Sequence, residues 1–261
     1  MNLKFVLINS TLAYIAATLL ATIIHEAGHF ITALSLGLDA TLYHNYVVSG
    51  EKSDFLSSIL VPAGGPVISL ISGILFLYTF NKISNPFISL LVFWLGIKGV
   101  ISFLGYLMIA PFVAVGDTGK IFSLIEMPMV WQLAIMVVSL LVAVLFLLKL
   151  HRGYEVFIHE DLQPIDKHKK GKWANALIMY PIFIGIVVTT LLAFPIPHIV
   201  SILPATTMPF MLFMTYGKII TSKNQLPANG SKNFNSLSYW LILISLVAVI
   251  LNRVLVFGLM L

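Results

Sequence analysis

Apolar runs of about twenty residues, separated by short polar intervals, repeat along most of the chain. A helix needs about twenty apolar residues to cross the hydrocarbon core of a bilayer. The sequence predicts such spans near residues 5–36, 57–80, 86–111, 127–150, 174–194, 199–220 and 237–258, with prolines interrupting the fifth and sixth. We therefore expect an all-α polytopic membrane protein with about six to seven transmembrane helices.

The polar intervals between spans carry further expectations. Residues Thr41–Val48 are rich in strand formers, which favours a β-hairpin or a re-entrant strand segment after the first helix. An extended substrate could pair with that segment by adding a strand. His44 and Asn45 within it are candidate substrate contacts, although a lone histidine in a polar loop is more often simply solvated. The backbone is expected to unwind after Pro111 into residues 115–120, and 151–172 is expected to be the most polar loop.

Three ionisable side chains interrupt the first apolar run: His25, Glu26 and His29. On a helix, the two histidines lie one turn apart on the same face, and that spacing lets two imidazole nitrogens bind one zinc ion. Glu26 is then placed to take a proton from a water molecule at the metal. Each ionisable group costs about 2.5 kcal/mol or more at the bilayer centre, so three within five residues indicate a function. The structural alternative is a polar cluster that caps the helix.

A third ligand is expected at the same depth, because a catalytic zinc ion usually takes three protein ligands. Spans one and three run in the same direction, and span two starts on the face where they end. The prolines and glycines at 62–66 either unwind span two or let it approach a neighbour closely. This arrangement brings the two histidines, Gly64-Gly65-Pro66 and Asp117 to one side, and it predicts Asp117 as the third ligand. The other candidate carboxylates are Glu126, Glu51 and Asp54.

These features resemble those of the site-2 protease family of intramembrane zinc metalloproteases. The resemblance covers residues up to about 120, and it rests on an aspartate after a proline-interrupted third helix and on two segments, His25-Glu26-Ala27-Gly28-His29 and Ala63-Gly64-Gly65-Pro66. Two positions depart from the family pattern: Ser69 stands nearest to a frequent asparagine, and Met108 replaces the asparagine of the third-ligand motif.

The resemblance implies a metalloendopeptidase that cleaves a transmembrane or membrane-adjacent protein within the bilayer. It implies Zn²⁺ held by His25, His29 and Asp117, with Glu26 as the base. Residues 1–125 are then expected to form a three-helix catalytic core, and residues 126–261 accessory transmembrane helices with no separate soluble domain. The cavity that receives water and substrate is expected to be lined by Gly64, Gly65 and Pro66.

Composition narrows the remaining classes. The chain has no cysteine, so histidine and carboxylate side chains must hold any zinc. Its net charge of +5 is concentrated in one loop, without basic patches interleaved with aromatics, which suits an anionic lipid surface and argues against nucleic acid. Lysine and arginine lie mainly on the amino-terminal side of the spans. The positive-inside rule therefore places the amino terminus in the cytoplasm, with the plasma membrane of a bacterium as the expected location. The family resemblance implies instead that the zinc site is the part nearer the cytoplasm.

Other functions stay open on the sequence alone. A catalytically silent homologue would keep the fold as a membrane binding or regulatory protein. An ion transporter would use the intramembrane histidines and aspartate as an ion path. A membrane zinc hydrolase that acts on a lipid or a small amide would need a pocket shaped for that substrate.

Overall fold

The computed structural model describes residues 2–50, 54–157, 167–196, 211–221, 232 and 234–260. Within these ranges, six helical segments are long and apolar enough to cross a membrane, which confirms the predicted all-α polytopic fold. In chain order they are α1 (Leu3–Ser35), α2 with η1 (Phe55–Thr79, Phe80–Lys82), α3 (Pro86–Ile109), α5 (Met129–Glu155), α6 with η3 and α7 (Lys167–Ala174, Asn175–Met179, Tyr180–Leu192), and α10 with η6 (Tyr239–Val254, Leu255–Phe257). Two shorter helices are α4 (Asp117–Leu124) and α9 (Phe213–Thr221).

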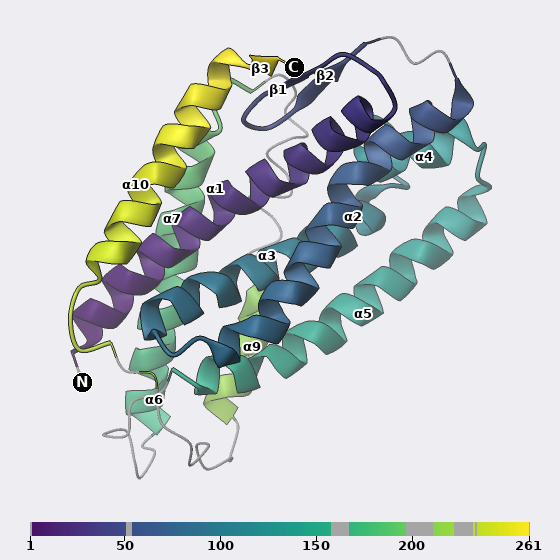
Figure 1. Ribbon diagram of the computed structural model, residues 1–261. Coiled ribbons are helices and arrows are strands. Elements are labelled where there is room, and N and C mark those ends of the chain that lie inside the picture. The colour runs from purple at the N-terminus through teal and green to yellow at the C-terminus, as the bar shows by residue number, and fades with distance from the viewer. Residues whose placement is uncertain are drawn as a thin grey trace.

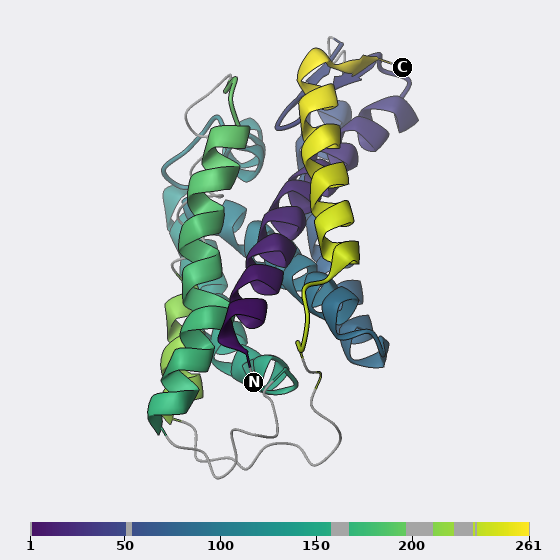
Figure 2. The ribbon, with the colours of Figure 1, turned by 90° about the vertical axis from the view of Figure 1, so that its left-hand side faces the viewer.

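Helix α1 runs through the middle of the bundle. Figure 2 shows it passing obliquely between α7 and α10, while α2 and α3 also pack against it (Figure 1). Many of its inward positions are small: Ala13 and Ala17 are fully buried. Between them, Tyr14 packs edge-to-face on Trp94 of α3 with ring centroids 5.0 Å apart. Small residues let helix backbones approach closely in a membrane, where packing holds helices together. This central helix is the one that carries the two histidines.

The C-terminal half of α1 meets α2 backbone against backbone. A Cβ added to Gly28 would lie 2.5 Å from the Gly64 carbonyl oxygen, and one added to Gly64 would lie 2.5 Å from the Gly28 carbonyl oxygen. Only glycine therefore fits at either position. Helix α2 stays continuous through Pro62 and Pro66. Of the two expectations for this segment, the structure thus shows close approach and not unwinding.

A small antiparallel sheet lies at the end of the bundle where α1 finishes (Figure 1). Strand β1 (Ala40–Leu42) pairs with β2 (Val47–Ser49), with Thr41 opposite Val48, and this pairing confirms the predicted hairpin. The other edge of β1 pairs with β3 (Leu259–Met260). Strand β3 was not predicted, because two residues are too few to show an alternating pattern.

Two polar intervals are more helical than expected. After α3 the chain turns through residues 110–116, so the predicted unwinding after Pro111 is confirmed as far as residue 116. Asp117 then begins α4, so the prediction was wrong for residues 117–120, which are helical. Helix α5 continues to Glu155 and α6 begins at Lys167, which shortens the predicted 151–172 loop; residues 158–166 lie outside the described residues. Of the predicted sixth span, only residues 211–220 are described, and they contain most of the short helix α9.

Candidate metal centre

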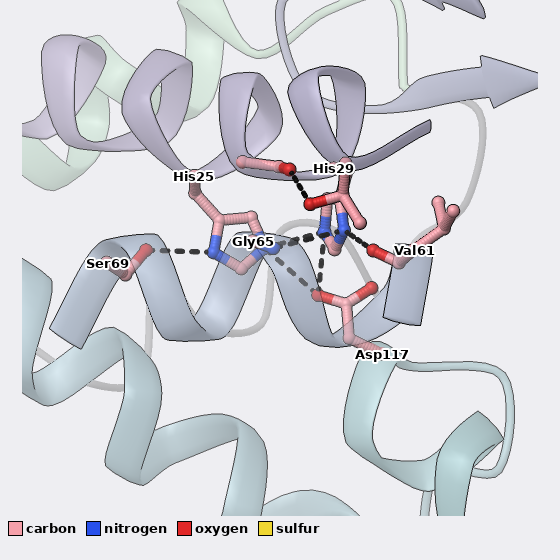
Figure 3. A network of polar contacts seen from close by, with 8 residues as sticks. His25, His29, Val61, Gly65, Ser69 and Asp117 are labelled. Atoms are coloured by element: carbon pink, nitrogen blue, oxygen red, sulfur yellow. Dashed lines mark hydrogen bonds and ion pairs between the residues drawn. The ribbon is translucent and has the colours of Figure 1, made fainter. Parts of the chain in front are cut away.

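The three predicted ligands converge at one point between α1 and α4 (Figure 3). Nε2 of His25 lies 2.9 Å from Oδ2 of Asp117, and Nε2 of His29 lies 3.2 Å from the same oxygen. The two Nε2 atoms are 3.2 Å apart. The three atoms therefore form a nearly equilateral triangle, with two corners supplied by adjacent turns of α1 and the third by the first residue of α4.

Each imidazole is held through its other nitrogen. Nδ1 of His25 lies 3.0 Å from the Ser69 hydroxyl, and Nδ1 of His29 donates to the Val61 carbonyl at 2.7 Å. Because a carbonyl oxygen only accepts, the proton of a neutral His29 sits on Nδ1 and Nε2 keeps its lone pair. Tyr106 stacks almost parallel on the His25 ring, with centroids 4.9 Å apart. Contacts of this kind fix the tautomer and orientation of metal-binding histidines.

Gly65 makes room for both rings. A Cβ added there would lie 2.6 Å from Cε1 of His29 and 2.8 Å from Nε2 of His25. Both distances are well inside van der Waals contact, so any larger residue at this position would displace the imidazoles. The absence of a side chain at Gly65 thus leaves room for the two imidazoles, and α2 forms one wall of the centre.

Asp117 approaches the histidines from a more open side. Its side chain is 24% exposed, whereas those of His25 and His29 are 5% and 9% exposed. The positive end of the α4 dipole favours a carboxylate at this first helical position. Burial raises the pKa of the Asp117 carboxyl, but the rings of His29 and His25 outweigh that effect and hold the pKa well below its ordinary value. A low pKa favours the ionised carboxylate, which is the form that binds a metal ion.

Glu26 lies beside this group without joining it. Its side chain is buried in the bundle, close enough to His25, His29 and Asp117 to interact electrostatically with each of them. Among the described residues it makes no hydrogen bond or ion pair. A buried carboxylate without such a partner is costly, which points to a role beyond packing.

The donor set suits a tetrahedral metal ion. Two imidazole nitrogens and one carboxylate oxygen form a group that could hold a metal, and bonds of about 2.0–2.1 Å would set tetrahedral ligand atoms about 3.3 Å apart. The sides of the observed triangle are 2.9, 3.2 and 3.2 Å.

No family model, curated protein or solved structure matches the chain. The geometry of the centre is thus the basis for its chemistry.

The remaining candidate carboxylates lie elsewhere. Glu126 is exposed in the turn that follows α4, and Asp54 caps α2 by accepting from the Ser57 backbone N–H at 3.1 Å. Glu51 falls outside the described residues. Within the described part of the chain, Asp117 is the carboxylate that the fold brings to the two histidines.

The polar residues of the hairpin turn face the end of α7. Nε2 of His44 and Nδ2 of Asn45 both donate to the Ala193 carbonyl, at 2.9 and 3.2 Å. His44 is buried, so it is not the solvated loop histidine of the simpler expectation. Burial lowers the pKa of His44, and the nearby Arg253 guanidinium lowers it further. These contacts tie the hairpin to α7, and a contact with substrate stays a prediction for both residues.

Several residues that shape the centre were not predicted as site residues. Ser69 was noticed only as a departure from a family pattern, and the Val61 carbonyl and the Tyr106 ring carry no motif. Gly64 and Gly65 were predicted to line a substrate cavity; here Gly64 packs on α1 and Gly65 on the imidazoles. Their contact with a substrate, like that of Pro66, stays a prediction.

Proposed function

We propose that this protein is an intramembrane zinc metalloprotease that hydrolyses a peptide bond of a transmembrane or membrane-adjacent protein. The observation that supports the proposal is the triangle of His25, His29 and Asp117 beside the buried Glu26, to which no described residue is hydrogen-bonded. Both histidines and Glu26 lie on a helix apolar enough to cross a membrane. Structural zinc sites are usually closed by four protein ligands, whereas catalytic sites use three and leave a position for water or substrate. Three ligand atoms with an adjacent carboxylate are the composition of a hydrolytic site.

Zinc, Glu26 and the residues that orient the imidazoles would have separate roles in hydrolysis. Zinc held by these ligands would supply a Lewis acid that polarises a peptide carbonyl and lowers the pKa of a water molecule toward 7. Glu26 would accept a proton from the water as the new C–O bond forms, and would deliver it to the leaving amide nitrogen as the C–N bond breaks. Ser69 and the Val61 carbonyl would keep the two imidazoles oriented throughout.

The hairpin offers a way to present the substrate. A peptide bond inside a helix is sheltered by its own hydrogen bonds, so the substrate has to become extended before it can react. Among the described strands, β2 is paired on one side only, and an extended segment could add to its other edge. Replacing alternate residues of Val47–Ser49 by proline should then slow cleavage without loss of metal, and unchanged cleavage would remove this step from the proposal.

Metal analysis and cleavage on a matched set of variants test the function. Purified wild type should carry about one zinc ion per chain, while His25→Ala and Asp117→Ala should lose it. Glu26→Gln should keep the metal yet cleave at least about 100-fold more slowly, because general-base catalysis contributes about that much or more. Glu126→Gln removes an exposed carboxylate outside the group and serves as the control.

The cleavage probes are dye-labelled β-casein in detergent and a panel of single-span peptides in proteoliposomes. Wild type and Glu126→Gln should cleave at the same rate. Wild-type rates in Glu26→Gln, or a wild-type protein that takes up no metal, would refute the proposed function.

A further inference from the structure

A cavity of about 270 Å³ opens at the end of the bundle that carries the amino terminus, far from the metal centre. It lies where the end of α2 with η1, the first half of α3 and the end of α5 come together (Figure 1). Aromatic side chains form much of its wall, among them Phe80, Phe93 and Phe146. The polar lining side chains are those of Asn81, Lys149 and Arg152. The cavity thus combines an apolar interior with two positive charges.

The two cations have no counterion in the described part of the chain. Lys149 and Arg152 are exposed, and neither makes a hydrogen bond or ion pair there. Lys232, by contrast, donates to the Phe80 and Ile83 carbonyls and to the Ser89 hydroxyl at 2.7–3.0 Å. Lys149 therefore differs from Lys232, because the charge of Lys149 is not used to hold parts of the fold together.

We propose that this cavity binds an anionic phospholipid, with the headgroup phosphate at Lys149 and Arg152 and the start of an acyl chain against the phenylalanines. Arginine matches a phosphate with paired N–H donors, and lysine adds a point charge. Basic pockets between membrane helices are where acidic headgroups bind. A volume of about 270 Å³ is slightly below the usual range for ligand pockets, so it accepts part of one chain while the rest stays in the bilayer.

Both the aromatic wall and the two cations of the cavity are needed to favour an anionic phospholipid. A soluble phosphate would leave the aromatic wall facing water. A zwitterionic lipid such as phosphatidylcholine would bring its own trimethylammonium group close to Lys149 and Arg152, so a lipid with a net negative charge is favoured. The backbones of α2 and α5 do not pack closely on one another, so a lipid held by residues of both would also bridge these two helices. Bound lipid should therefore raise the thermal stability of the bundle.

The test compares a double variant with a charge-matched control. Lys149→Gln/Arg152→Gln removes the two cations of the cavity. Lys4→Gln/Lys172→Gln removes two exposed charges from the amino-terminal ends of α1 and of the α6–α7 span and leaves the cavity intact. Native mass spectrometry in a neutral detergent would titrate each protein with phosphatidylglycerol and with phosphatidylcholine. Glycerol phosphate, which has no acyl chain, would be the competitor that reports on free phosphate binding.

Wild type and control should bind one phosphatidylglycerol, and the cavity variant should bind it about 30-fold more weakly, since each basic residue near a membrane surface contributes about fivefold. Melting in phosphatidylcholine nanodiscs, where the three proteins should agree, shows that the variants are folded. Added phosphatidylglycerol should raise the melting temperature of wild type and control only. Equal retention or equal stabilisation in all three proteins would overturn the proposal, as would displacement of the lipid by glycerol phosphate.

Discussion

Gly65→Ala tests whether the metal centre is shaped by the absence of a side chain. The added methyl carbon would stand 2.6 Å from Cε1 of His29 and 2.8 Å from Nε2 of His25, where carbon contacts normally need 3.4 Å or more. The rings would therefore have to retreat by nearly 1 Å. Metal–ligand distances tolerate only about 0.2 Å, and even the loss of an outer hydrogen bond weakens metal binding by about 10–100-fold. We expect zinc affinity to fall by about 100-fold.

The neighbouring glycine provides the contrast. A Cβ at Gly64 would meet the backbone of α1 and not the rings, so Gly64→Ala should lower the melting temperature with or without metal. Gly65→Ala should lower the melting temperature of the metal-free protein less than Gly64→Ala does, because imidazole side chains can rotate away from the added methyl at the loss of their contacts with Ser69 and Val61, whereas the α1 backbone cannot move aside. Gly217→Ala, which has open space around its Cβ, is the benign control.

Titration calorimetry with zinc and thermal melting in detergent separate these outcomes. Two distinct defects, lost metal at one position and lost stability at the next, are the expected result. Wild-type zinc affinity in Gly65→Ala would show that the imidazoles do not bind the ion from the positions described here.

Three further changes probe other parts of the protein. Ser69→Ala should weaken zinc binding by about 10-fold or more with little change in stability, because it frees the Nδ1 side of His25, and calorimetry would detect this. Burial keeps the pKa of His44 in the folded protein below its ordinary value near 6.5. The contribution of neutral His44 to stability is therefore complete above pH 6.5, and it is lost at lower pH as the histidine of the unfolded chain takes up a proton. The melting temperature should fall between pH 7.5 and 5.5, and it should fall less in His44→Gln. Tyr14→Phe removes the hydroxyl that accepts from Lys98 at 2.8 Å and leaves a buried ammonium without that partner, so it should cost about 1–3 kcal/mol in unfolding. The double variant Tyr14→Phe/Lys98→Met removes both partners and should recover most of that loss; a double variant no more stable than Tyr14→Phe would contradict the pairing.

The sequence predicts most of the fold because its signals are local. Apolar runs mark the spans directly, and the four-residue spacing of His25 and His29 needs only a helix to become a metal-binding pair. Asp117 required one more step, the directions of the first three spans. That step placed Asp117 beside the two histidines even though the surrounding segment was expected to unwind, because helix direction depends on the number of crossings and not on local conformation.

What the sequence could not predict depends on contacts between distant backbones. The carbonyl of Val61 orients His29, yet a carbonyl is present in every residue and so carries no signal. Helix α5 continues past its apolar run through Lys149 and Arg152, because these residues favour helix and can extend beyond the hydrocarbon layer. The two-residue strand β3 forms only because the hairpin offers it an edge.

The three candidate ligands lie on parts of the fold that are packed to different degrees. His25 and His29 belong to a helix whose backbone touches α2 at Gly28, so neither can shift without moving two membrane spans. Asp117 stands on an eight-residue helix between two turns, with its carboxylate partly open to the surroundings. If zinc binds here, we therefore expect it to leave from the side of Asp117, and replacing Asp117 by asparagine should speed its removal by a chelator more than it changes the fold.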